Sequence, residues 1–149
     1  MTTAMPRGFM NVKVHELMTE SVLTTERHTT VDHVRHVMER NRIGAMPVVD
    51  SDGQPVGIIS ASDLVGDVKG GAPVSSIMTE KVYTVPKYED VSIAARVMRN
   101  HGIHRVVVTH EQKVVGVLSS FDLLTLVEDR RWVAKNPPTE SQRKGPNRS

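Results

Sequence analysis

The sequence predicts an α/β (α+β) fold built from two copies of one β-α-β-β-α unit. The first observation is a repeat, because residues 14–25, VHELMTESVLTT, match residues 74–85, VSSIMTEKVYTV, at an offset of sixty. The second is an amphipathic segment with apolar residues at helical spacing in each copy. The third is the pair of short β-branched runs that follows it. The repeat runs on to Gly57, Ser60, Asp63 and Leu64, which align with Gly116, Ser119, Asp122 and Leu123.

The same elements are expected in the same order in both copies. A strand is expected around residues 22–24 and 82–84, and Thr30 and Asp90 suit the N-caps of the next helices. Strands follow at 45–49 and 105–109 and, after a polar turn, at 56–59 and 114–118. A second helix is expected to begin at Ser60 and at Ser119.

A unit of this size buries little apolar area by itself. We therefore expect the copies to pack sheet to sheet about a pseudo-twofold axis, with clefts between them that suit a ligand. The expected organisation is an N-terminal extension at 1–11, copies at 12–69 and 74–132, a linker at 70–73 around Gly70 and Gly71, and a tail at 133–149.

Composition limits the classes of function. With 38% hydrophobic but only 3% aromatic residues, the core must be aliphatic, and the lack of cysteine excludes disulfides and thiolate metal sites. A cytoplasmic location fits best, since neither a signal peptide nor an apolar stretch of about 20 residues is found. Six of the 19 Lys and Arg follow Asp129, against one of the 17 Asp and Glu. We expect a flexible basic tail and no nucleic-acid binding, because the body has no basic face.

Four motifs in each copy resemble one known family. The order MT, V-x-T, IGAMPVVD and GIISASDL resembles a cystathionine-β-synthase (CBS) domain, and two in tandem resemble a Bateman module in a stand-alone CBS-domain protein. The resemblance covers about residues 12–128. It implies a disc-like pair, commonly a homodimer, that catalyses no reaction. Such a pair binds AMP, ADP, ATP, S-adenosylmethionine or a similar adenosyl nucleotide as a regulatory ligand and signals to a separate regulated protein.

The Ser-x-x-Asp motif at Ser60–Asp63 and Ser119–Asp122 has two compatible interpretations. One is a capping box, in which the serine and the acidic residue satisfy free amides at the helix start. The other is a binding site, since a helix start attracts phosphate and a carboxylate accepts from ribose hydroxyls. The resemblance implies the second role in addition to the first.

The resemblance also implies the site residues by position. Asp63 and Asp122 would bind ribose, Ser60 and Ser119 would lie near phosphate, and the backbones of Thr24 and Thr84 would line the adenine pocket. The lip between the first helix and the next strand would be formed by Ile43, Gly44 and Met46 and by Ile103, His104 and Val106. One site would combine Thr24 and Met46 with Asp122, and the other would combine Thr84 and Val106 with Asp63.

The copies differ at the lip. Gly44 and Ala45 of the first copy are replaced by His104 and Arg105 in the second. Arg105 could bind phosphate through its planar fork or pair with a surface carboxylate, and His104 could add pH-dependent charge. Phe121 replaces Ser62, and its ring would either cover an adenine or crowd it out.

Other functions have weaker support. His33 and His36 lie three apart beside Asp32, a spacing that could bind a metal, but no third inward-facing ligand is evident. Neither a nucleophile elbow nor a phosphate loop occurs, so we expect no catalysis. The alternative to a nucleotide sensor is a ligand-independent protein-interaction module.

Overall fold

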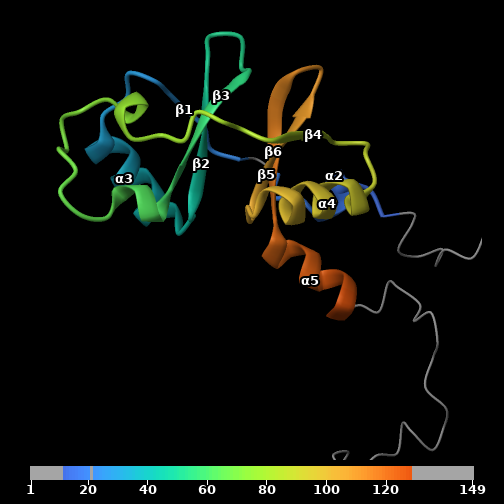
Figure 1. The fold of residues 1–149 in the computed structure, drawn as a ribbon. Helices are drawn as coiled ribbons and strands as arrows, with labels where there is room; N and C mark the ends of the chain where they lie inside the picture. Colours follow the sequence, from blue (N-terminus) through green and yellow to red (C-terminus); the bar gives the residue numbers. More distant parts are fainter. Residues whose placement is uncertain (1–11, 21, 129–149) are drawn as a thin grey trace, which may run out of the picture.

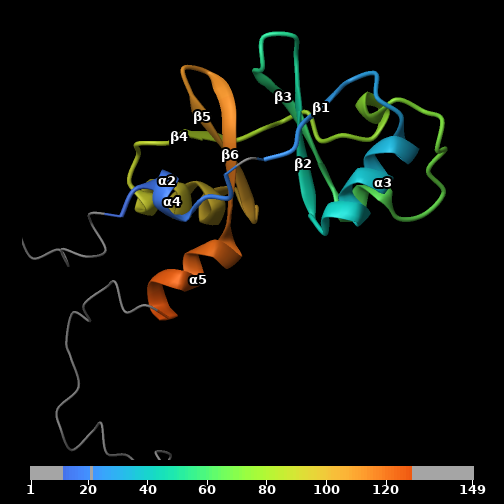
Figure 2. The ribbon, with the colours of Figure 1, turned by 180° about the vertical axis from the view of Figure 1, so that it is seen from behind.

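The computed structural model describes residues 12–20 and 22–128. Two three-stranded sheets lie next to each other at the centre, and most of the helices lie on their outer sides (Figures 1 and 2). The first copy holds β1 (Thr25–Glu26), α3 (Val31–Asn41), β2 (Ala45–Val49) and β3 (Pro55–Ser60). The second holds β4 (Thr84–Pro86), α4 (Val91–His101), β5 (Arg105–His110), β6 (Lys113–Ser119) and α5 (Ser120–Glu128). The short elements are α2 (Val14–Leu17) and the 3-10 turns η1 (Ala61–Leu64) and η2 (Val74–Ser76).

The two sheets have the same topology. In each, the first strand is parallel to the second and the second is antiparallel to the third, in the orders β1-β2-β3 and β4-β5-β6. Ala45 lies opposite Ser60 in one register and Arg105 lies opposite Ser119 in the other. The lip and the Ser-x-x-Asp motif of each copy therefore meet at one end of its sheet.

Most predicted elements are confirmed, with shifts at the first strands. β2 spans residues 45–49 as predicted, while β1 and β4 begin later than the predicted 22–24 and 82–84. Thr30 caps α3 by accepting from the His33 amide at 3.2 Å. Asp90 occupies the N-cap position of α4 but makes no capping bond, and its Oδ1 accepts from Lys13 Nζ at 3.0 Å.

The prediction of a second α-helix is wrong for the first copy. Only the 3-10 turn η1 forms after Ser60, whereas α5 runs for nine residues after Ser119. Val65 has an extended backbone, and Gly66 has a φ of +93° that a helix cannot contain. In the second copy the apolar run Leu123-Leu124 continues to Leu126, which is buried, so the helix has a core to pack on.

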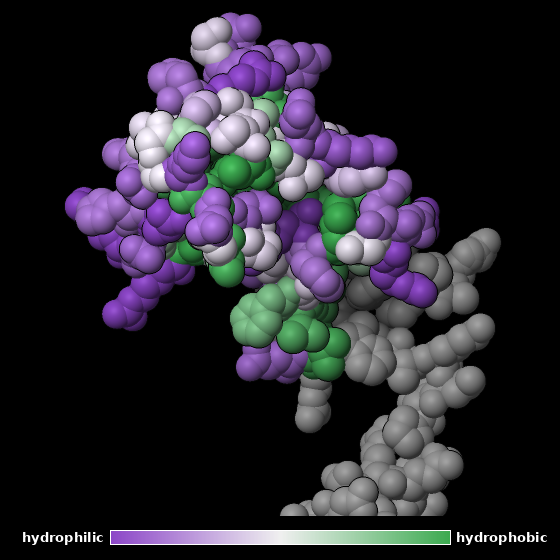
Figure 3. Space-filling view, turned by 60° about the vertical axis from the view of Figure 1, so that its left-hand side comes forward, coloured by the Kyte–Doolittle hydropathy of each residue, from purple (hydrophilic) through white to green (hydrophobic). Residues whose placement is uncertain are grey.

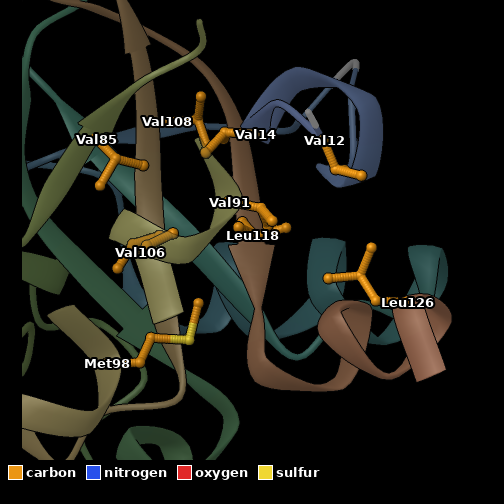
Figure 4. Packing of buried hydrophobic residues seen from close by; sticks show 10 residues of the cluster. Val12, Val14, Val85, Val91, Met98, Val106, Val108, Leu118 and Leu126 are labelled. Atoms are coloured by element: carbon orange, nitrogen blue, oxygen red, sulfur yellow. The ribbon is translucent and has the colours of Figure 1, made fainter. Parts of the chain in front are cut away.

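The two hydrophobic cores exchange their leading segments. The core of the second copy contains Val12 and Val14 from the start of the chain, next to Val108, Leu118 and Leu126 (Figure 4). The core of the first copy, in turn, contains Val74, with Ile77 and Met78 packed against it. Each copy is therefore completed by the segment that precedes the other copy's first strand.

Two glycines allow the exchanged segments to approach the sheets. Thr19 forms a bridge to Val117, and Thr79 forms the equivalent bridge to Ile58. A Cβ at Gly116 would lie 2.6 Å from Met18 Sδ, and one at Gly57 would lie 2.5 Å from Met78 Sδ. Only a residue without a side chain fits at either position. Within the described residues, no helix is both long and apolar enough to cross a membrane.

Candidate ligand-binding cleft between the two copies

A cleft of about 820 Å³ lies between the copies, a volume that suits a small-molecule ligand. Its walls come from the segment before β1, the end of α3 with the lip before β2, the lip before β5, and the start of α5. The lining residues are Thr19, Val22, Leu23, Asn41, Arg42, Ile43, Gly44, Ala45, His104, Arg105, Val117, Ser119, Ser120, Phe121 and Asp122.

The start of α5 presents Ser119 and Asp122 to the cleft. The Ser119 amide donates to Asp122 Oδ2 at 2.9 Å, and the Asp122 amide donates to Ser119 Oγ at 3.1 Å, which is a complete capping box. Among the described residues these bonds leave Asp122 Oδ1 free to accept and the Ser119 hydroxyl proton free to be donated. Capping thus orients both groups without using up their capacity for a ligand.

Three basic side chains line the cleft together with the single carboxylate of Asp122. They are Arg42, His104 and Arg105. Arg105 Nη2 reaches across the pseudo-twofold, because a Cβ at Gly44 would lie only 2.9 Å from it. In the described part of the chain, neither arginine forms an ion pair with a carboxylate. The cleft is therefore suited to an anionic ligand.

The remaining wall of the cleft is apolar. Val22, Leu23, Ile43 and Val117 line it, and Leu23 keeps 40% of its surface exposed. Phe121 stands at the start of α5 with 77% of its surface exposed. An apolar wall therefore lies beside one carboxylate and two guanidinium groups in the same cleft.

The structure brings together six of the thirteen residues predicted for the site. These are Ile43, Gly44, His104, Arg105, Ser119 and Asp122, which all line the cleft. Thr24 lies instead in a separate depression with Thr29 and His33. Met46 and Val106 are 1% exposed and belong to the two cores, so their side chains are not open to a ligand. Met46 and Val106 are each the second residue of their strand, and they face inward because side chains alternate along a strand.

The four remaining residues belong to the second predicted site, which stays a prediction. The Ser60 amide and hydroxyl both donate to Asp63 Oδ2, at 2.8 and 3.1 Å. Ile103 packs against the second core. Thr84 lines a pocket at the far end of the sheets with Pro55, Tyr88 and His110, away from Asp63.

Arg42 is the main site residue that the sequence reasoning missed. It ends α3 in the left-handed region with φ 54°, which is uncommon for a residue other than glycine. The repeat contained the signal, since the aligned residue is Gly102, which is the usual residue at this position. An arginine where glycine is favoured indicates a side chain retained for another reason.

The described part of the chain offers no cluster of three His, Asp or Glu side chains that could hold a metal. His36 Nε2 lies 2.8 Å from the Arg40 guanidinium, and Asp32 pairs with Arg35 at 3.0 Å. These residues are thus engaged along the exposed face of α3 rather than directed at a common point.

A comparison with protein families accounts for both copies. The model described as the CBS domain matches residues 14–70 and again residues 74–129. The chain belongs to the CBS domain family. Its two CBS domains form the α+β pair of a Bateman module, as the sequence predicted.

The curated relatives are mostly longer proteins. An uncharacterized protein of Methanocaldococcus jannaschii is 29% identical over 137 residues, which cover 80% of this chain and 32% of that protein. The inosine-5'-monophosphate dehydrogenase of Halobacterium salinarum is 35% identical over 108 residues, which cover 70% of this chain and 22% of the enzyme. The chain thus spans about a third or less of the length of these two relatives.

Solved structures resemble the CBS pair along most of its length. The CBS domain of a membrane protein from Sphaerobacter thermophilus has a TM-score of 0.74 at 31% identity, covering 80% of this chain and 90% of that one. The CBS pair of protein MJ0100, solved with 5'-methylthioadenosine and S-adenosyl-L-methionine, has a TM-score of 0.73 at 25% identity, covering 80% and 98%. CBS pairs of this fold therefore include one that binds adenosyl compounds.

Proposed function

We propose that this CBS pair is a non-catalytic regulatory module that binds a phosphorylated adenosine nucleotide in the cleft between its domains. The observation that carries the proposal is a cleft of about 820 Å³ in which Asp122 and three basic side chains converge. Asp122 helps to cap α5 through Oδ2 and keeps Oδ1 free. The MJ0100 pair, which binds two adenosyl compounds, supports the class of ligand.

Each part of the nucleotide has a matching surface. Asp122 Oδ1 accepts from the ribose hydroxyls, as acidic residues do in other nucleotide folds. The apolar wall of Val22, Leu23 and Ile43 packs against the adenine. Arg42, Arg105 and the free hydroxyl of Ser119 bind the phosphates at the start of α5, where the helix dipole also favours negative charge. The excess of basic groups favours phosphates over the cationic sulfonium of S-adenosylmethionine.

In such a module, α5 transmits ligand binding to the association with other chains. Phe121 lines the cleft and also begins an exposed apolar stripe with Leu124 and Val127, each 58% exposed. Figure 3 shows hydrophobic side chains gathered on this helix. We propose that the stripe contributes to a homodimer or to the contact with a separate regulated protein. A ligand at Phe121 then acts on the association, provided that it binds the two arrangements with different affinity.

Calorimetry tests the ligand. Adenosine, AMP, ADP, ATP and S-adenosylmethionine are titrated separately into the protein, and melting temperatures are measured in parallel. A ligand that binds only folded protein should add about 2.7 kcal/mol of stability at a hundred times its Kd. Absence of heat and of any melting shift with all five at millimolar concentration would contradict the proposal and favour a ligand-independent interaction module.

The role of Arg105 is tested with Arg105→Ala. We expect ATP affinity to fall by about ten- to a hundredfold, since loss of a hydrogen bond to a charged group costs about 1.5–3 kcal/mol. Adenosine affinity should change little. Arg99→Ala, on the exposed side of α4, is the matched control. An equal loss for ATP and adenosine would show that Arg105 does not contact phosphate.

A further inference from the structure

The repeat supplies two Ser-x-x-Asp motifs, but the structure gives them different chemistry. We infer that each chain binds one nucleotide, in the cleft of Asp122, and that the motif of Ser60 and Asp63 does not bind a second one. The inference rests on the proposed function, and it replaces the two symmetric sites that the repeat suggests.

The hydroxyl protons of Ser119 and Ser60 differ in whether they already have an acceptor. Ser119 Oγ accepts from the Asp122 amide at 3.1 Å, so its own proton is free for a phosphate oxygen. Ser60 Oγ instead lies 3.1 Å from Asp63 Oδ2, to which it donates, and 2.9 Å from Ser62 Oγ. The single proton of Ser60 is therefore engaged within its own turn. Asp63 Oδ2 in addition accepts from the Ser60 amide at 2.8 Å.

The helical elements that begin at the two motifs differ as well. α5 has nine residues, and its backbone dipoles add up at the end that faces the cleft. The equivalent element is a four-residue 3-10 turn, which ends at Val65 and provides no comparable dipole. Phosphate bound at Ser60 would therefore lack the electrostatic support that it finds at Ser119.

The residues equivalent to Leu23 and Arg42 of the Asp122 cleft also differ. Leu23, 40% exposed, is replaced by Tyr83, whose ring stacks on His101 with centroids 4.1 Å apart and planes 24° from parallel. Tyr83 also packs against the second core. Arg42 is replaced by Gly102, so a cation is missing as well. The second copy thus has a bulkier side chain in place of Leu23 and no cation in place of Arg42.

Calorimetry with ATP tests the inference on two matched variants, Asp122→Asn and Asp63→Asn. Asparagine keeps a carbonyl oxygen that can accept the capping bond, so the helix start is preserved while the charge is lost. Melting temperatures without ligand confirm that both variants fold. For the wild type we expect one ATP per chain. Asp122→Asn should raise the Kd tenfold or more, whereas Asp63→Asn should leave the Kd within twofold and the stoichiometry at one.

The possible outcomes separate this inference from the proposed function. Two ATP per chain, an equal loss in both variants, or a loss confined to Asp63→Asn would overturn the inference while leaving nucleotide binding established. If the wild type gives no heat with ATP, then the proposed function fails and the inference fails with it. One ATP per chain that is lost only in Asp122→Asn supports both.

Discussion

Individual side chains in this CBS pair combine folding and binding roles. Ser119 and Asp122 cap α5 through hydrogen bonds of 2.9 and 3.1 Å and at the same time face the cleft. Arg42 ends α3 at φ 54°, and its side chain lines the same cleft. Substitutions at these residues will therefore change stability as well as affinity, and the two effects must be measured separately.

At Ser119 the stability effect can be predicted. Ser119→Ala removes the acceptor of the Asp122 amide, and loss of an N-cap hydroxyl typically costs about 0.5–2 kcal/mol of unfolding free energy. Urea unfolding without ligand measures it. Ser76→Ala is the control, since that exposed hydroxyl only donates to the Pro73 carbonyl in a 3-10 turn. An unchanged urea midpoint for Ser119→Ala would mean that the capping bond contributes nothing to stability.

Among the elements, the contact between β6 and the segment around Met18 leaves no room for added volume. The Thr19 amide donates to the Val117 carbonyl at 2.9 Å, which draws the two backbones together at Gly116. The same arrangement recurs at Gly57, where the Ile58 amide donates to the Thr79 carbonyl at 2.9 Å. These contacts join each sheet to the leading segment of the other copy.

Gly116→Ala should therefore destabilise the protein. Its Cβ would lie 2.6 Å from Met18 Sδ and 2.9 Å from the Thr19 carbonyl oxygen, and the backbone oxygen cannot move aside easily. Overpacking of this kind costs about 1–3 kcal/mol. Gly71→Ala is the matched control, because nothing lies within 4 Å of its Cβ. Thermal or urea unfolding compares the two, and equal stability would show that the leading segment shifts without cost.

The exchange of leading segments predicts that the whole molecule unfolds as one cooperative unit rather than as two independent CBS domains. Val14 is fully buried in the second core and Val74 is fully buried in the first. Full burial of a valine contributes about 1.5–3 kcal/mol, a large share of a total stability of about 5–15 kcal/mol. Either copy taken alone would lose the valine that the other leading segment places in its core. Its own leading segment would have no core to pack against.

We accordingly expect that fragments 12–69 and 74–128, expressed separately, show no cooperative thermal transition. Circular dichroism and calorimetry of each fragment, with residues 12–128 as the control, test this. A fragment that melts cooperatively by itself would show that the exchanged segments are not required for either core.

The association of whole molecules is tested at α5. Leu124→Glu places a charge in the exposed apolar stripe, where it should convert a dimer to a monomer with little effect on folding, since Leu124 is 58% exposed. Light scattering at tens of micromolar protein measures the mass. Val65→Glu, at an apolar residue that is 77% exposed outside the stripe, should leave the mass unchanged. A wild type that is monomeric with and without nucleotide would contradict the proposed dimer.

Features that depend on neighbours a few residues apart could be predicted from the amino-acid sequence. The repeat, the spacing of apolar residues in α3 and α4, the strand β2 and the cap at Thr30 all follow from local patterns, and the structure confirms them. Local pattern also placed Ser119 and Asp122 together at a helix start. The resemblance to CBS domains added the expectation that a site combines both copies.

Which core each leading segment completes could not be predicted from local patterns and follows from tertiary packing. Val14 and Val74 are the same residue at equivalent positions of the repeat, so both cores are chemically acceptable to both segments. The choice depends on which sheet the chain can reach, and that is settled by packing rather than by local pattern. The same holds for the cleft, which Arg42 and Asp122 both line although they are far apart in the sequence. It also holds for the motif of Ser60 and Asp63, whose 3-10 turn ends at Val65.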